Sequence, residues 1–188
     1  MYYHGESKMI MTYNECIERL NGVNLFRQAL LEGRLHKLEK GIYSNNKYES
    51  ELSILAHKYP KAVLTLHSAF YYHGLTDVIP ESYYFATDKD SSKIKDARVT
   101  QSFDNSGHLM LGAIETKIED ADVLMYNKER MLIELIRNKP KLPFDYYKEI
   151  IRNYREIIHE LDIQAIQEYA EQLPKSALVK RVLRMEVL

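Results

Sequence analysis

The chain has 188 residues, 45% of them hydrophobic, which is enough to bury the core of one domain, or of a domain beside a small module. Its 26 Lys and Arg against 27 Asp and Glu give a net charge of −1, which excludes a uniformly basic nucleic-acid coat and a polyacidic tail. The single cysteine, Cys16, excludes an intramolecular disulfide and a cysteine zinc site.

The first predicted elements are two short helices and a hairpin. Thr12 and Glu15 have the spacing of a capping box, which predicts a helix that begins after Thr12 and ends at the turn pair of residues 21–22. Residues 23–32 carry apolar side chains at helical spacing and predict a second, amphipathic helix. Residues 35–44 have apolar side chains on both sides of a Gly-containing turn and predict a β-hairpin.

The order helix, turn, helix, hairpin is typical of a winged helix-turn-helix, which we expect to occupy residues 1–47. In that design the second helix lies in the major groove of DNA and the hairpin contacts the backbone or the minor groove. Amide side chains pair with base edges, and basic side chains contact phosphates. The predicted base-reading residues are Asn24 and Gln28, and the predicted phosphate contacts are Arg27, Arg34, His36, Lys37 and Lys40.

The charge of this module is only mildly basic. Residues 1–48 carry seven basic and five acidic side chains, and Glu32 and Glu39 lie among the predicted phosphate contacts. Tight DNA binding usually needs several unopposed contacts, so a wing that only packs on the rest of the protein is an alternative.

Residues 48–188 are expected to form a larger mixed α+β domain that ends in several helices, so the predicted fold class is α+β. Apolar periodicity and turn residues set the elements. The predicted helices cover 48–59 and 67–73, the predicted strands cover 62–66, 82–87, 98–103, 109–117 and 123–126, and the chain is helical from residue 128 to its end. Residues 62–66 are alternatively part of the helix that follows them.

The histidine and serine residues of this second domain do not form a catalytic pattern. His67 and His73 are six residues apart, which places them on different faces of a helix, whereas a zinc pair needs a spacing of four. Ser68 lacks the flanking glycines of a nucleophile elbow. We therefore expect these side chains to pack and to form hydrogen bonds.

Charged residues of the second domain are interpreted as surface groups. Arg130, Glu134 and Arg137 have the spacing of ion pairs on a helix surface. The many carboxylates lack the pattern of a metal site, although a metal-dependent nuclease or nucleotidyltransferase that uses them is a third alternative for the function. These carboxylates belong to Asp88, Asp90, Asp96, Glu115, Glu119, Asp120 and Asp122. We expect no enzyme activity, no cofactor and no bound metal.

No run of about 18 apolar residues occurs, so no membrane-spanning helix is expected. Residues 1–8 lack the apolar stretch of a secretory signal peptide. With a single thiol, these features predict a cytoplasmic protein with a reduced cysteine.

Three segments occur in an order that resembles a known family: LHKLEKGIYS, AVLTLHSAFYYHGLTDVIPESYYFAT and VLMYNKERMLIELIRNK. The most specific residues are Lys40-Gly41-Ile42-Tyr43, and Ser68-Ala69 followed by His73-Gly74-Leu75. From about residue 12 onward the chain resembles the AbiEi antitoxins of bacterial type IV toxin–antitoxin systems, which act in abortive infection and phage defence.

The resemblance implies an N-terminal winged helix that binds promoter DNA of its own operon and represses it, and an α+β domain with antitoxic activity. The implied toxin is an AbiEii-like nucleotidyltransferase that the antitoxin need not touch. Family members usually have a further helix before the helix-turn-helix, whereas only eleven residues precede Thr12, so we expect a reduced module. A homodimer would double its DNA contacts. The alternative function is a protein-interaction module that has lost DNA binding and neutralises a toxin by direct contact.

Overall fold

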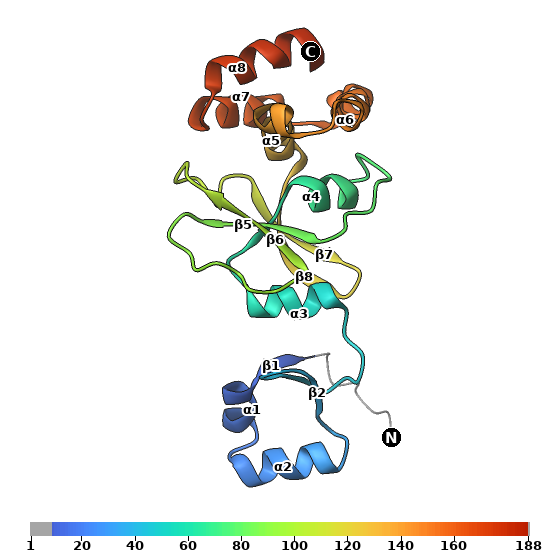
Figure 1. Ribbon diagram of the computed structural model, residues 1–188, viewed down its shortest axis with the longest axis vertical. Helices are drawn as coiled ribbons and strands as arrows, with labels where there is room; N and C mark the ends of the chain where they lie inside the picture. Colours follow the sequence, from blue (N-terminus) through green and yellow to red (C-terminus); the bar gives the residue numbers. More distant parts are fainter. Residues whose placement is uncertain (1–8, 188) are drawn as a thin grey trace. The chain divides into compact units, whose positions relative to one another are not determined.

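The computed structural model describes residues 9–187, which form two compact units (Figure 1). The first unit extends to Pro60 and also includes Glu119–Asp122, and the second contains Lys61–Ile118 and the chain from Val123 onward. Helices and strands contribute to both units, so the fold class is α+β, as predicted.

The first unit contains a three-stranded antiparallel sheet and three helices. The sheet has the order β1-β3-β2, and Ile10 pairs with Ser44 at one end of it. The strands are β1 (Ile10–Thr12), β2 (His36–Glu39) and β3 (Ile42–Ser44), and the helices are α1 (Tyr13–Arg19), α2 (Val23–Leu31) and α3 (Glu51–Lys58). The sequence analysis identified the hairpin and the helices but missed β1, which has only three residues.

Helix α1 begins as the sequence predicts. The backbone N–H of Glu15 donates to Thr12 Oγ1 at 3.3 Å, and the backbone N–H of Thr12 donates to Glu15 Oε2 at 2.6 Å, which completes the capping box. The turn to α2 uses Asn21 and Gly22, both at positive φ. Glycine adopts that conformation without steric strain, and asparagine tolerates it better than most residues.

Apolar side chains of α1, α2 and the hairpin form the core of the first unit. Cys16, Phe26, Ala29, Leu35 and Tyr43 are all buried in one cluster. The Phe26 and Tyr43 rings pack edge to face with their centroids 5.0 Å apart. These contacts fix one face of α2 to the unit and leave the opposite face in solvent.

Helix α3 belongs to the first unit, which therefore continues past Lys47. It packs against β1. His57 lies 3.3 Å from Glu15, and Lys58 forms a 3.1 Å ion pair with Glu39. The module that the sequence analysis outlined thus contains a further helix, which follows the hairpin.

The second unit is built on a five-stranded mixed sheet with the order β6-β5-β4-β8-β7. Strand β4 pairs antiparallel with β5 and parallel with β8, and β5 pairs parallel with β6. The strands are β4 (Val63–Leu64), β5 (Tyr83–Asp88), β6 (Val99–Asp104), β7 (Ala113–Ile118) and β8 (Ala121–Tyr126).

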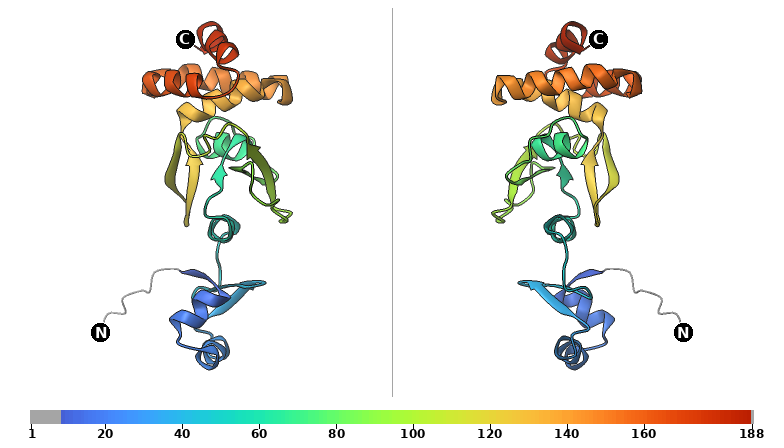
Figure 2. Two further views of the ribbon diagram at one scale, coloured as in Figure 1. Left: turned by 90° about the vertical axis from the view of Figure 1, so that its left-hand side faces the viewer. Right: turned by 90° about the vertical axis from the view of Figure 1, so that its right-hand side faces the viewer.

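The remaining helices are α4, between β4 and β5, and α5 to α8, which are grouped at one end of the sheet in both views of Figure 2. No helix among residues 9–187 is long and apolar enough to cross a membrane. The helices are α4 (Leu66–Tyr72), α5 (Lys128–Asn138), α6 (Phe144–Ile157), α7 (Ile163–Gln172) and α8 (Ser176–Val182), which continues as a π-helical turn, Leu183–Val187.

Helix α5 is the central helix of this unit, with an unbroken buried run from Arg130 to Ile136. The expectation that Arg130, Glu134 and Arg137 form ion pairs is confirmed, but their predicted place on the helix surface is wrong. Arg130 is only 1% exposed and Glu134 is also buried. Helical spacing placed the three on one face correctly, but it could not show that this face is covered.

Candidate nucleic-acid interface

Helix α2 presents a polar face to solvent. Phe26 and Ala29 point into the core, so the residues on the other side of the helix are exposed. Asn24, Arg27 and Gln28 are all exposed and follow the three- and four-residue spacing that places side chains on one helix face. The structure therefore brings together three of the predicted DNA-contacting residues.

The carboxylate of Glu32 accepts hydrogen bonds from two of the predicted DNA-contacting residues. Gln28 Nε2 donates to Glu32 Oε1 at 2.6 Å, and Arg34 Nε donates to Glu32 Oε2 at 2.7 Å. Hydrogen bonds from Arg34 and then from Gln28 lower the pKa of Glu32, so this side chain is charged at neutral pH. Glu32 thereby partly cancels the field of Arg34, and Gln28 must leave it in order to read a base.

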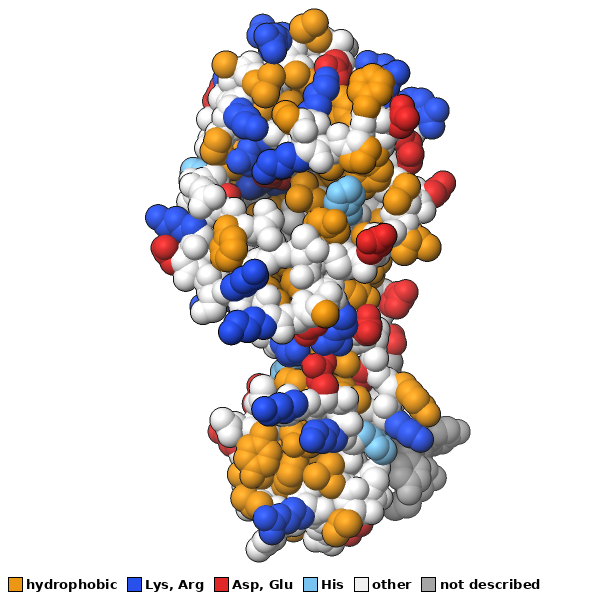
Figure 3. Space-filling view, viewed as in Figure 1, with side chains coloured by type: hydrophobic (Ala, Val, Ile, Leu, Met, Phe, Trp, Pro, Cys, Tyr) orange, Lys and Arg blue, Asp and Glu red, His pale blue; other side chains and the backbone are white. Residues whose placement is uncertain are grey.

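The hairpin carries the other predicted basic contacts. Gly41, at φ +79°, makes the turn between β2 and β3. Lys37 and Lys40 are exposed and, like Arg27, form no ion pair with any carboxylate among the described residues. His36 is half-buried and pairs with Ser44 in the sheet. On the face of this unit that Figure 3 shows, Lys and Arg side chains are interspersed with apolar ones and form no continuous basic patch.

Sequence reasoning missed the apolar part of this surface. Leu31 is 88% exposed and Leu25 is 48% exposed, and both lie on α2. Leu31 follows Asn24 and Gln28 by seven and three residues, which puts it on the polar face. The Leu30-Leu31 pair before Gly33 was the available signal, because only one of two adjacent helical residues faces the core.

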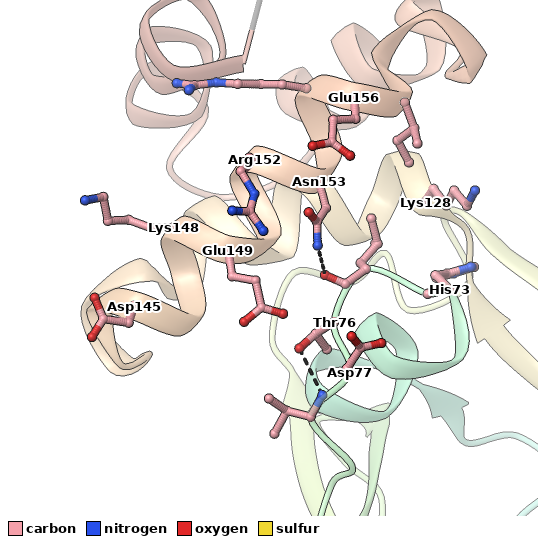
Figure 4. Close-up of a pocket in the computed structure, with 15 residues that line it drawn as sticks. His73, Thr76, Asp77, Lys128, Asp145, Lys148, Glu149, Arg152, Asn153 and Glu156 are labelled. Atoms are coloured by element: carbon pink, nitrogen blue, oxygen red, sulfur yellow. Dashed lines mark hydrogen bonds between the residues drawn. The ribbon is translucent and has the colours of Figure 1, made fainter.

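The second unit contains an open hollow of about 980 Å³ between α6 and the segment after α4 (Figure 4). Figure 4 shows Glu149 and Asn153 pointing toward the segment of Thr76 and Asp77, and Asn153 Nδ2 donates to the Leu75 carbonyl at 3.0 Å. The hollow is lined by equal numbers of acidic and basic side chains, so its charge favours no particular class of ligand. The acidic residues are Asp77, Asp145, Glu149 and Glu156, and the basic ones are Lys128, Lys148, Arg152 and Arg155.

The two histidines of α4 and its C-terminus serve in packing and hydrogen bonding. The His67 ring lies 4.7 Å from the Tyr84 ring and 4.9 Å from the Tyr146 ring. His73 Nε2 lies 2.7 Å from the Tyr126 carbonyl oxygen, and burial lowers its pKa. Within residues 9–187, no three His, Cys, Asp or Glu side chains converge as metal ligands.

Comparison of the sequence with protein-family models and with curated proteins found no match. A functional proposal therefore depends on the surface of α2 and the hairpin, and on the residues that resemble AbiEi antitoxins.

Proposed function

We propose that the protein is a non-enzymatic, cytoplasmic antitoxin of the AbiEi type, and that its first unit binds promoter DNA of its own operon as an autorepressor. The observation that carries the DNA-binding part is the exposed face of α2, with Asn24, Arg27 and Gln28, followed directly by the basic hairpin. No cofactor is part of the proposal.

The dimensions of α2 suit this role. Its nine residues span about 14 Å at 1.5 Å per residue, and an α-helix with its side chains is about 10–12 Å across, which fits a major groove about 12 Å wide. Asn24 and Gln28 lie one helical turn apart, so both amides face the same stretch of base edges. Arg27 lies between them, and Lys37 and Lys40 extend the basic surface along the hairpin toward phosphates.

The antitoxin part of the proposal is based on the resemblance. Its most specific residues support the fold: Gly41 makes the hairpin turn, and Gly74, at φ +68°, follows the end of α4. Ser68 Oγ accepts a hydrogen bond from the Tyr84 backbone N–H at 2.9 Å. The partner implied is an AbiEii-like nucleotidyltransferase toxin, opposed functionally without a need for physical contact.

Binding to the promoter duplex upstream of the gene tests the proposal, with a scrambled duplex beside it at two salt concentrations. Charge reversal of Arg34, Lys37 and Lys40 to Glu is expected to weaken binding to the promoter and to reduce its salt dependence. The matched control is reversal of Lys93, Lys95 and Lys117, which are exposed in the second unit and produce the same change in net charge. Equal binding by wild type and the first variant would reject this interface.

The exposed leucines of α2 favour a second candidate, a protein-interaction module without DNA affinity. Large exposed apolar side chains on one element are typical of protein-binding surfaces. On this hypothesis the toxin co-purifies with the wild-type protein, Leu31→Ser releases it, and the promoter is not preferred over scrambled DNA. Promoter preference that Leu31→Ser leaves intact would favour the first candidate.

A further inference from the structure

The buried polar cluster of α5 contains more positive than negative charge. Arg130 Nε donates to Glu134 Oε1 at 3.0 Å, and Arg137 Nη1 donates to the same oxygen at 2.6 Å. Glu134 Oε2 accepts from Asn138 Nδ2 at 3.2 Å. One carboxylate thus serves two guanidinium groups, whose side chains are 1% and 17% exposed. Burying an uncompensated charge is costly, so the cluster is a place where an anion would be stabilised.

The guanidinium groups of Arg130 and Arg137 differ in how many of their N–H groups donate hydrogen bonds. Arg130 Nη1 also donates to the carbonyls of His108 and Leu111, and its guanidinium lies over the Tyr126 ring at 4.5 Å. Arg137 Nε, in contrast, is buried and has no hydrogen-bond partner among the described residues. Buried donors are nearly always paired, so this unused N–H calls for an acceptor.

A cavity of about 270 Å³ adjoins this cluster, within the second unit. Arg130, Arg137 and Glu134 line it together with Lys141, Lys175 and Asp104. Four basic and two acidic side chains therefore surround it, in contrast to the balanced hollow beside α6. The volume is below the usual range for drug-sized ligands and suits a small group.

The carboxylates that line the cavity already accept hydrogen bonds from protein groups, whereas its lysines have N–H groups that remain available to a ligand. Asp104 accepts from Ser106 Oγ and from the backbone N–H groups of Ser106 and His108. Lys175 Nζ makes a 2.8 Å bond to the Arg137 carbonyl, which leaves two of its three N–H groups, and Lys141 forms no ion pair within residues 9–187. The cavity thus offers donors to an anion and few acceptors to a cation.

Backbone strain occurs at the same place. Leu66, which lines the cavity, has φ +43°, a conformation that a bulky residue rarely adopts. Strained residues of this kind are concentrated at binding sites, where the surrounding structure holds them.

We propose that this cavity binds a phosphate group, as free phosphate or as the phosphate monoester of a small metabolite, through Arg137, Lys141 and Lys175. A tetrahedral oxyanion accepts hydrogen bonds on every side, which matches converging N–H donors and the excess of two positive charges. The site is separate from the DNA-binding surface proposed for the first unit and does not depend on it.

The test is calorimetric titration of the full chain with inorganic phosphate, and separately with adenosine monophosphate, at constant ionic strength in chloride. Saturable binding of at least one is expected, with an affinity at least about tenfold weaker in the Lys141→Gln, Lys175→Gln double variant. Both lysines are exposed, so the variant is expected to fold. Phosphate binding alone identifies the free ion, and tighter monophosphate binding identifies the ester.

The matched control is the Lys93→Gln, Lys95→Gln double variant, which removes the same charge elsewhere on the second unit and is expected to bind as wild type does. Arg137→Gln, checked for folding by circular dichroism, is expected to weaken binding as well. Absence of binding at millimolar ligand, or equal binding by the Lys141, Lys175 variant and the wild type, would overturn the proposal.

Discussion

Salt dependence of DNA binding is the most discriminating prediction for the first unit. Arg27, Lys37 and Lys40 are exposed and form no ion pair with a carboxylate in residues 9–187, whereas Arg34 is paired with Glu32 at 2.7 Å. Each phosphate contact contributes about −0.9 to the slope of log K against log salt, so three unpaired cations predict a slope of about −2.7 per bound chain. Between about 50 and about 200 mM salt the affinity should then fall about 40-fold.

Two variants move that slope in opposite directions. Exchange of Lys37 and Lys40 for Gln should reduce it to about −0.9, because only Arg27 remains unpaired. Glu32→Gln should free Arg34 and steepen the slope by about 0.9. Fluorescence anisotropy with a labelled promoter duplex over a salt series measures both. A slope that neither variant changes would refute the assignment of these residues to phosphate contacts.

Two stability predictions test the packing and the capping box. Gly112→Ala should lower the free energy of unfolding by about 3 kcal/mol, because a Cβ at φ +74° would lie 2.6 Å from Arg130 Cβ. Gly107→Ala, at φ +77° but with no atom within 4 Å, should lower it by only about 1 kcal/mol; equal losses in urea denaturation would contradict the predicted clash. The backbone N–H of the N-cap lowers the pKa of Glu15 from 4.5, so its stabilising contribution is present above pH 4.5 and is lost as pH falls through the lower folded-state value. Urea denaturation between about pH 6 and about pH 3 should show a smaller pH dependence for Glu15→Gln, and an unchanged profile would exclude this role.

Local signals allowed much of the fold to be predicted. The capping box of Thr12 and Glu15 and the glycines Gly33, Gly41 and Gly74 marked element boundaries, and all three glycines have positive φ. These features depend on residues within one or two turns of each other, so the sequence alone reports them.

Features that depend on distant partners were not predicted. Strand β1 exists because Ile10–Thr12 pairs with β3, about thirty residues later in the chain. The order β6-β5-β4-β8-β7 likewise follows from pairing between segments far apart in the sequence. Periodicity identifies the face of α5 that carries Arg130 but not what covers that face, which is why its burial was missed.

The candidate DNA interface shows the same division. Helical spacing correctly placed Asn24, Arg27 and Gln28 on one face of α2. The sequence analysis noted Glu32 among the basic residues but did not predict its hydrogen bond with Gln28, and the further bond from Arg34 depends on how the chain turns after α2. That turn decides how many cations remain available to phosphates.

Ion pairing thus limits the proposed DNA site and motivates the proposed phosphate site. On the exposed surface of the first unit, the carboxylate of Glu32 competes with DNA phosphates for the Arg34 side chain. Because water already solvates Arg34, its ion pair with Glu32 adds little stability to the fold. In the second unit, the buried guanidinium of Arg130 and the largely buried one of Arg137 share Glu134, and a bound anion would restore stability that this excess charge removes. Because a ligand that binds only the folded state stabilises it by about 2.7 kcal/mol at a hundred times its Kd, phosphate should raise the unfolding temperature measurably. This effect requires no DNA, so each proposal can fail without the other.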